Sequence, residues 1–274
     1  MKNFDNRRRA FADVVTIDAW HSEFGEYAQT VDLHADIVFG TSRVGGEEEA
    51  PVRFRLSVRR AEVVLIIPES EPVSVDRTTV SRDAPESQGH LTETLERSTR
   101  ASAKAKIAGS VSSSGVIGSA EAEAGAEAVI LATTKMETSG TVQFMLVTQS
   151  KTAEGHYRWT VTPRHSRTLD GRPWDGAKQP RLKLIDKRSD RSKGIPPTVR
   201  FEVRCRREDL VIEDLEIKNE LLWDRLKAKT GFTNRLAAAE SYIRDRLAEE
   251  GFAATQIDEK FAELIIASAT AETN

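Results

Sequence analysis

Apolar and polar residues alternate along several stretches of the chain, and this period of two residues predicts β-strands. The stretches are 11–20, 27–39, 52–67, 142–146, 157–162 and 181–186, and the first two are rich in Val, Ile and Thr. A loop with Gly45-Gly46 and three consecutive glutamates separates 27–39 from 52–67. We therefore expect a mainly β fold whose core is an antiparallel sheet or sandwich.

One of these stretches recurs later in the chain. Residues 52–66 align without gaps to residues 199–213, and both copies begin with Val-Arg-Phe and keep an apolar residue at alternate strand positions. Each copy also carries an Arg-Arg pair at the same place, Arg59-Arg60 and Arg206-Arg207. The repeat indicates a duplicated domain or a pseudo-symmetric sandwich, against the alternative that short β-rich segments resemble one another by chance.

From residue 218 onward the pattern changes to a helical period. We expect three helices: 219–230, which stops at Gly231; 233–250, which stops at Gly251; and a third that starts at a Thr255–Asp258 capping box and runs through Ile266. Apolar stripes on the last two helices indicate that they pack against the rest of the protein.

The segment 99–128 folds back on itself when a turn is placed at Ser113-Ser114. Arg100 then faces Glu127, Lys104 faces Glu123 and Lys106 faces Glu121. The same register sorts small and apolar residues onto one face of a β-hairpin, and we predict that this face meets a membrane: Ala101, Ala103, Ala105, Ile107, Val111, Val116, Ala120, Ala122 and Ala124. The opposite, polar face carries Arg100, Lys104, Lys106, Glu121, Glu123 and Glu127.

A helical pair is the alternative for this segment, because alanine is the best helix former. Four glycines oppose it, since each would cost about 1 kcal/mol inside a helix. Glutamates at alternate positions also line up on a strand and scatter around a helix. We favour the hairpin.

These elements divide the chain into three parts. We expect a β core from residues 1–70 and 155–217, an inserted hairpin region at 71–154 and a C-terminal helical segment at 218–274. The residues between 69 and 88 are rich in Pro, Ser and Asp and form a connection to the insertion.

Composition and motifs exclude several classes of protein. The formal net charge is −3, which gives no overall attraction to nucleic acid, so we expect no nucleic-acid partner. The single cysteine, Cys205, cannot form an intramolecular disulfide and matches Val58 in the repeat, so we expect a core thiol. The N-terminal sequence has no secretory apolar run and no stretch reaches ~18 apolar residues, so we expect a cytoplasmic protein that associates with a membrane only on activation.

No pattern of chemical residues predicts catalysis. The five histidines have no metal-ligand spacing, and there is no phosphate-binding loop, nucleophile elbow or zinc-protease motif. We expect a non-enzymatic protein with no cofactor and no bound metal.

Two neighbouring loops are basic and are candidates for contact with an anion or an anionic lipid. Their candidate contact residues are Arg164, Arg167, Arg172, Trp174, Lys187, Arg188 and Arg191. The alternative is ordinary solvated loop charge, which four nearby aspartates partly neutralise.

The amphipathic hairpin region resembles β-pore-forming proteins of the aerolysin or gasdermin kind. The resemblance covers residues 91–151 and is one of pattern, without a family motif. It implies a homo-oligomer in which the charged face of the hairpin lines a lumen and the apolar face meets lipid. The alternative function is an interaction scaffold or a subunit of a bacterial complex, which would hold a protein or nucleic-acid partner through the basic loops and the C-terminal helices.

Overall fold

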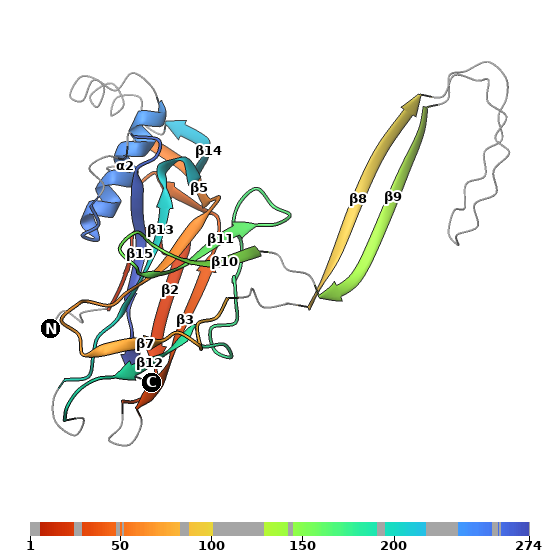
Figure 1. Cartoon of the computed structure of the whole chain (residues 1–274). Helices are drawn as coiled ribbons and strands as arrows, with labels where there is room; N and C mark the ends of the chain where they lie inside the picture. Colours follow the sequence, from red (N-terminus) through yellow and green to blue (C-terminus); the bar gives the residue numbers. More distant parts are fainter. Residues whose placement is uncertain are drawn as a thin grey trace, which may run out of the picture. The chain divides into compact units, whose positions relative to one another are not determined.

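A computed structural model describes residues 6–24, 29–47, 50, 52–82, 88–100, 129–141, 145–190, 195–217, 235–253, 257 and 259–273. The chain forms two compact units (Figure 1). Unit 1 consists of Met1–Glu86 and Gln143–Asn274, and unit 2 consists of Ser87–Val142.

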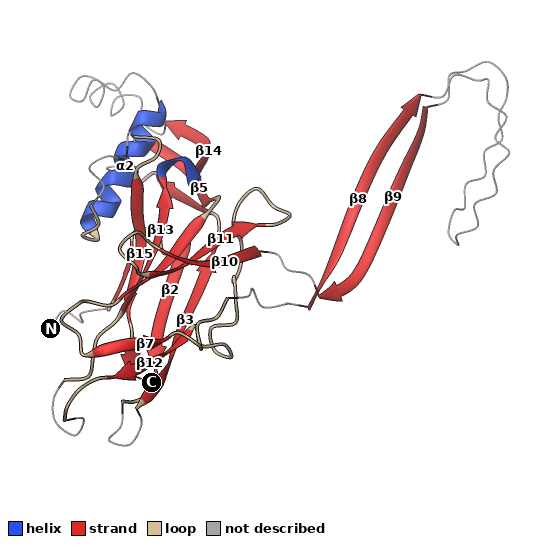
Figure 2. Cartoon of the chain, in the orientation of Figure 1, coloured by secondary structure: helices blue, strands red, loops and turns tan. Residues whose placement is uncertain are grey.

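Unit 1 is built from three sheets in the described part of the chain (Figure 2). The largest has six antiparallel strands in the order β1 (Arg7–Arg9), β15 (Glu263–Thr270), β13 (Arg200–Arg206), β6 (Ala61–Ile66), β11 (Tyr157–Pro163) and β10 (Met145–Lys151). The second has the order β16 (Glu272–Thr273), β2 (Val15–His21), β3 (Thr30–Phe39), β12 (Leu182–Asp186) and β7 (Val73–Asp76). The third has the order β14 (Leu210–Ile217), β5 (Val52–Val58) and β4 (Ser42–Gly45).

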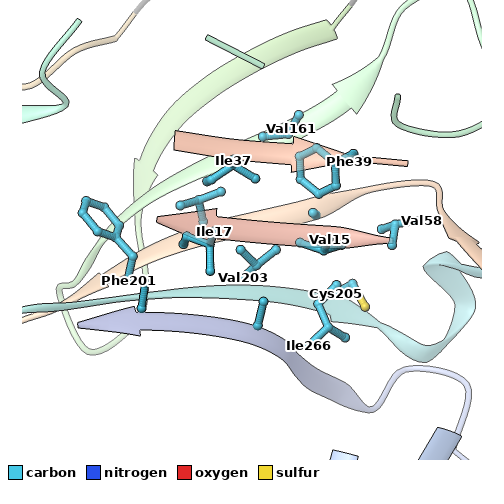
Figure 3. Close-up of a cluster of buried hydrophobic side chains, with 14 of the residues drawn as sticks. Val15, Ile17, Ile37, Phe39, Val58, Val161, Phe201, Val203, Cys205 and Ile266 are labelled. Carbon is cyan, nitrogen blue, oxygen red and sulfur yellow. The ribbon is translucent and has the colours of Figure 1, made fainter. Parts of the chain in front are cut away.

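The five-stranded and six-stranded sheets pack face to face around a hydrophobic core. Buried and half-buried residues alternate along β2 and β3, as expected for strands with one face in a core. Figure 3 shows Ile17 of β2 and Ile37 of β3 in one cluster of buried side chains. Val203 of β13 and Ile266 of β15 belong to the same cluster. The mainly β fold predicted from the alternating pattern is therefore confirmed, and its core is a sandwich.

The third sheet carries the α-helix that the structure describes near the C-terminus, α2 (Arg235–Glu249). Helix α2 contacts β5 and β14 through the buried residues Ala238, Ala239, Ile243 and Leu247. The Tyr242 ring meets the Phe54 ring of β5 edge to face, with centroids 5.9 Å apart. The helix predicted at 233–250 is confirmed. Leu236, an apolar residue that we expected on the buried stripe of this helix, is 46% exposed.

The third predicted helix, which formed part of the expected helical segment 218–274, is wrong. The chain from Glu263 to Thr270 is strand β15, which lies between β1 and β13 in the six-stranded sheet. Leu264, Ile266 and Ala267 are buried there, because an interior strand of a packed sheet needs apolar side chains on its core face and strand partners on both edges. The helix predicted at 219–230 lies outside the described residues.

A buried cation lies between two core tryptophans. The Arg181 side chain is fully buried, and its guanidinium carbon is 4.4 Å from the ring centroid of Trp174 and 5.9 Å from that of Trp159. One guanidinium nitrogen donates to the Ser81 hydroxyl, whereas Nε and Nη1 have no hydrogen-bond partner among the described residues. Burial lowers the pKa of Arg181 to about 10.

The first prediction concerns this cation. Arg181→Met keeps much of the side-chain volume and removes a poorly compensated buried charge, so the free energy of unfolding is expected to change by less than about 1 kcal/mol. Arg181→Ala leaves a cavity between the two rings and is expected to cost about 3 kcal/mol. Urea denaturation followed by tryptophan fluorescence measures both. Equal losses in the two variants would show instead that the guanidinium contacts themselves stabilise the fold.

Candidate functional site

The described part of unit 2 is a two-stranded antiparallel ribbon. It consists of β8 (Gln88–Arg100) and β9 (Val129–Thr141), paired without a register shift from Gln88↔Thr141 to Arg100↔Val129. Among the described residues, β8 and β9 pair only with each other. Each strand of the ribbon therefore has one edge that no other described strand covers.

The register corrects one pair that the sequence predicted. Arg100 lies opposite Val129, not Glu127, so the pairing is shifted by two residues from the expected one. Cross-strand charge pairs contribute only roughly 0.2 to 1 kcal/mol each, which is too little to fix a register that the whole length of β8 and β9 determines. Because the shift is an even number of residues, it does not move any position to the other face of the ribbon.

The predicted membrane-facing positions from Ala101 to Ala124 lie outside the described residues. The same holds for the predicted polar-face positions from Lys104 to Glu127. Arg100 is the one member of either set that falls within β8.

Two of the residues that the sequence suggested for anion contact in the basic loops of unit 1 are turned inward or bound by a carboxylate. Trp174 is 2% exposed and donates its Nε1 hydrogen to the Ala35 carbonyl oxygen at 2.6 Å, so its side chain belongs to the core. Arg188 is bound through Nε and Nη2 to the carboxylate of Asp186, which is why the pKa of Arg188 is raised. Trp174 is therefore not a surface residue, and the guanidinium group of Arg188 is bound within the protein by Asp186.

The other cations of these loops are exposed. The Arg172 Nε lies 3.0 Å from a carboxylate oxygen of Asp36. Arg164, Arg167 and Lys187 are exposed, and Arg191 lies outside the described residues.

The structure brings together instead the two Arg-Arg pairs of the repeat. Both copies form a strand, a corner at the arginines and a second strand: β5 to β6 in the first copy, and β13 to β14 in the second. The first strand of each copy pairs with the second strand of the other, β5 with β14 and β13 with β6. A short 3-10 turn, η1 (Arg207–Asp209), forms the second corner.

The two corners touch each other. The Arg59 backbone N–H donates to the Asp209 carbonyl oxygen at 2.7 Å. Arg60 and Arg206 line one cavity, and Arg59 and Arg207 line a second. The repeat was the sequence signal for this cluster, but the sequence did not show that the two copies exchange strands.

The first cavity is a closed network of ion pairs. Its volume is about 80 Å³ and it is lined by Arg60, Glu62, Arg158, Arg204, Cys205, Arg206, Asp209 and Glu263. Glu62 pairs with Arg158 at 3.1 Å, and Glu263 pairs with Arg204 at 2.8 Å. Because carboxylates already bind these guanidinium groups, the network stabilises the corner rather than offering free cations to a ligand.

The second cavity is larger, and carboxylates hold its cations less closely. Its volume is about 340 Å³ and it is lined by Arg59, Arg207, Glu208, Glu240 and Lys260. Arg207 is held by Glu240 of α2, with Nε 3.0 Å from a carboxylate oxygen. Lys260 reaches Glu208 only at 4.0 Å, and the exposed Arg59 side chain makes no ion pair or hydrogen bond among the described residues.

Three further features were predicted from the sequence: a buried cysteine, no metal site and no membrane-spanning helix. Cys205 is buried, as predicted, and burial raises the pKa of its thiol far above the ordinary value. In the part of the chain that the structure describes, no three His, Cys, Asp or Glu side chains are grouped as metal ligands. Among the described helices, none has the length and hydrophobicity needed to cross a bilayer.

Comparisons with known proteins give a weak likeness to two toxins. No protein-family model matches the chain, and no curated protein matches it significantly. The chain is similar to the membrane-inserted form of the Clostridium perfringens NetB toxin, with 8% identity, coverage of 69% of this chain and 84% of that one, and a TM-score of 0.28. It is also similar to Clostridium perfringens delta-toxin, with 8% identity, coverage of 69% and 72%, and a TM-score of 0.29. With TM-scores this low, the likeness decides neither the fold nor the function of this chain.

The second prediction concerns Asp209, which lines the smaller cavity. Burial raises the pKa of its carboxyl above the ordinary value of 3.8. The folded state therefore binds this proton more tightly than the unfolded state, and the contribution of the Asp209 carboxyl to stability falls as the pH rises from below 3.8 through the raised pKa. Asp209→Asn removes this penalty and retains an acceptor for the Arg206 backbone N–H, so it is expected to be more stable than wild type at pH 7.

Thermal unfolding at pH 7 and at pH 3 tests this expectation. The stability gain of Asp209→Asn should shrink at pH 3, where the carboxyl is protonated in both states. Asp170→Asn removes one negative charge from an exposed loop and is the matched control. A variant less stable than wild type at pH 7 would show that the Asp209 charge is held by favourable contacts with nearby arginines.

Proposed function

We propose that this protein is not an enzyme and acts by oligomerising, so that ribbons from several copies insert into a membrane and perturb or perforate it. The observation that supports the proposal is the ribbon of β8 and β9, whose strands pair with no other described strand. It is also the part of the chain from which the small-residue segment 101–128 extends.

The uncovered edges of the ribbon favour assembly. A two-stranded ribbon is only marginally stable in water, because it buries little apolar surface, and its unpaired edges are templates for further strands. Each strand of this ribbon has 13 residues, which is long for an edge that remains unpaired. Pairing of β8 from one copy with β9 from the next would satisfy both edges and would close a barrel if repeated around a ring.

The length beyond the ribbon is sufficient to cross a bilayer. A turn near residue 114 leaves about 14 residues on each side of the segment 101–128, which span ~46 Å at ~3.3 Å per residue. A transmembrane β-strand needs only ~9 to 11 residues. If the observed register continues, Ala101 through Val111 and Val116 through Ala124 at alternate positions still share the face proposed to meet lipid.

Charges in the sequence of β8 set a boundary for insertion. Glu93 and Arg97 precede Ala101 by eight and four residues in the sequence, so a strand that continued through Ala101 would carry all three on one face. A basic residue on the lipid face near the midplane of a membrane costs roughly 2 to 4 kcal/mol, so the inserted part begins after Arg97. The residues of β8 before that point would form the portion of the barrel outside the bilayer.

The third prediction tests the register of the proposed hairpin. Continuation of the observed pairing places Lys106 opposite Glu123, whereas the pairing expected from the charges places Lys104 there. The double variant Lys106→Cys with Glu123→Cys is expected to form a disulfide on mild oxidation, and Lys104→Cys with Glu123→Cys is the matched control. Preferential crosslinking of the control pair would mean that the register changes after Arg100. The buried Cys205 can remain in place.

The fourth prediction tests insertion. Wild-type protein is expected to release dye from liposomes that contain anionic lipid. Ile107→Asp places a charge on the proposed lipid face and should abolish release, because the acidic group must enter hydrocarbon. Lys104→Glu changes charge on the proposed lumen face and should retain release while shifting the ion selectivity of conductance.

Two outcomes would reject the pore. One is the absence of dye release by wild type under all lipid and activation conditions, and the other is undiminished release by Ile107→Asp. Unchanged circular dichroism and thermal unfolding of the variant exclude loss of the soluble fold as the cause. The interaction scaffold would then replace the pore as the function.

A further inference from the structure

The loop that connects α2 to β15 is held firmly against the second arginine corner. The Arg207 backbone N–H donates to the Ala262 carbonyl oxygen at 2.9 Å, and the Glu208 backbone N–H donates to the Lys260 carbonyl oxygen at 3.0 Å. These two bonds fix the loop on both sides of Phe261. The backbone that carries the Phe261 side chain is therefore fixed in position.

Phe261 is an exposed aromatic side chain next to exposed positive charge. Its side chain is 67% exposed, and the Lys260 ammonium lies 5.7 Å from the centre of its ring. Lys260 itself is 72% exposed. An aromatic ring that gains nothing from the protein core is suited to the boundary between lipid headgroups and acyl chains.

The cavity beside Phe261 has more positive than negative charge available to a ligand. Arg207 and Glu240 neutralise each other through a close ion pair. Arg59 makes no ion pair among the described residues, and Lys260 reaches the Glu208 carboxylate only at 4.0 Å, while Arg206 lies 3.7 Å from the same carboxylate. A cavity of about 340 Å³ between two such cations is large enough to admit a phosphate group with part of its ester.

We propose that Arg59, Lys260 and Phe261, which we name the corner surface, dock the protein on a bilayer that contains an anionic phospholipid. The headgroup phosphate enters the cavity between Arg59 and Lys260, and the Phe261 ring lies among the headgroups. This inference rests on the proposed membrane activity and names the surface through which unit 1 makes its first contact.

The corner surface is better suited to this role than the basic loops. The loop with Arg164 and Arg167 carries comparable exposed charge, but no large hydrophobic side chain between 164 and 172 is exposed. Attraction by charge alone falls with distance and salt, whereas an aromatic ring beside the charges adds burial in the interface. The corner surface differs from the basic loops because it has exposed charge and an exposed aromatic ring side by side.

The experiment measures cosedimentation of the full-length protein with vesicles of phosphatidylcholine, with and without phosphatidylserine. Wild type is expected to bind the vesicles that contain phosphatidylserine and to lose binding as salt rises. The double variant Arg59→Gln with Lys260→Gln is expected to bind about 30-fold more weakly, since each basic residue near an anionic surface contributes about fivefold. Phe261→Ser, which leaves the charge unchanged, is expected to weaken binding by about tenfold.

The matched control is Arg164→Gln with Arg167→Gln, which removes the same charge from another exposed loop. It should change binding by less than about threefold, because it lacks the neighbouring aromatic ring and the cavity. Equal weakening by the two double variants would overturn the corner surface in favour of nonspecific attraction. Wild-type binding by Phe261→Ser would overturn the role of the ring.

Binding and dye release are measured separately, so the two proposals can fail independently. Ile107→Asp should bind vesicles like wild type and release no dye. Wild type that binds phosphatidylserine vesicles through the corner surface without releasing dye would reject the pore and retain the docking surface. Corner variants that bind normally would reject the docking surface, whatever their dye release.

Discussion

Each of the two Arg-Arg segments carries the chain from one sheet to another, and the hydrogen bond between them holds the crossing together. A strand that leaves one sheet must turn, and at the turn its backbone groups lose their partners in the ladder. Here the Arg59 N–H finds the Asp209 carbonyl oxygen at 2.7 Å, so one corner satisfies the other. The exchange of strands between β5, β6, β13 and β14 brings the two corners to this contact. Because the first strand of each copy completes the sheet of the other, neither copy of the repeat can form its sheet pairings alone.

The crossing also brings the four corner arginines together. Arg59 is exposed, whereas Arg207 is only 9% exposed and its guanidinium is held by Glu240 of α2. The other two lie close to carboxylates: an Arg60 guanidinium nitrogen is 3.5 Å from an oxygen of Glu62, and one of Arg206 is 3.7 Å from an oxygen of Glu208. Both cavities are lined by more basic than acidic side chains, but at the second cavity Arg59 has no ion pair among the described residues and Lys260 reaches Glu208 only at 4.0 Å. These two cations are the ones that the proposed anion contact uses.

The period of two residues was sufficient to predict the sandwich, because a strand with one buried face must alternate. It located β2, β3 and β11 without knowledge of their partners. The residues around Leu264 to Ile266 were misassigned to a helix because a short apolar run fits either period, and only the neighbours β1 and β13 decide between them. Trp174 was misassigned to the surface for a related reason: its loop is polar, but the ring folds beneath it to bond the Ala35 carbonyl oxygen. The position of Arg59 beside Asp209 is a contact between distant segments, and no local pattern encodes it.

The two units differ in how far their strands are paired. Unit 1 pairs its described strands within three sheets, and carboxylates bind many of its arginines. Unit 2 leaves both edges of a 13-residue pairing uncovered by any described strand. A neighbouring strand can supply such an edge with a continuous ladder of donors and acceptors, which water cannot do in the same order. In the proposed function, pairing of this kind between copies would drive assembly, and a surface that first concentrates copies on a bilayer would raise the rate at which the ribbons meet.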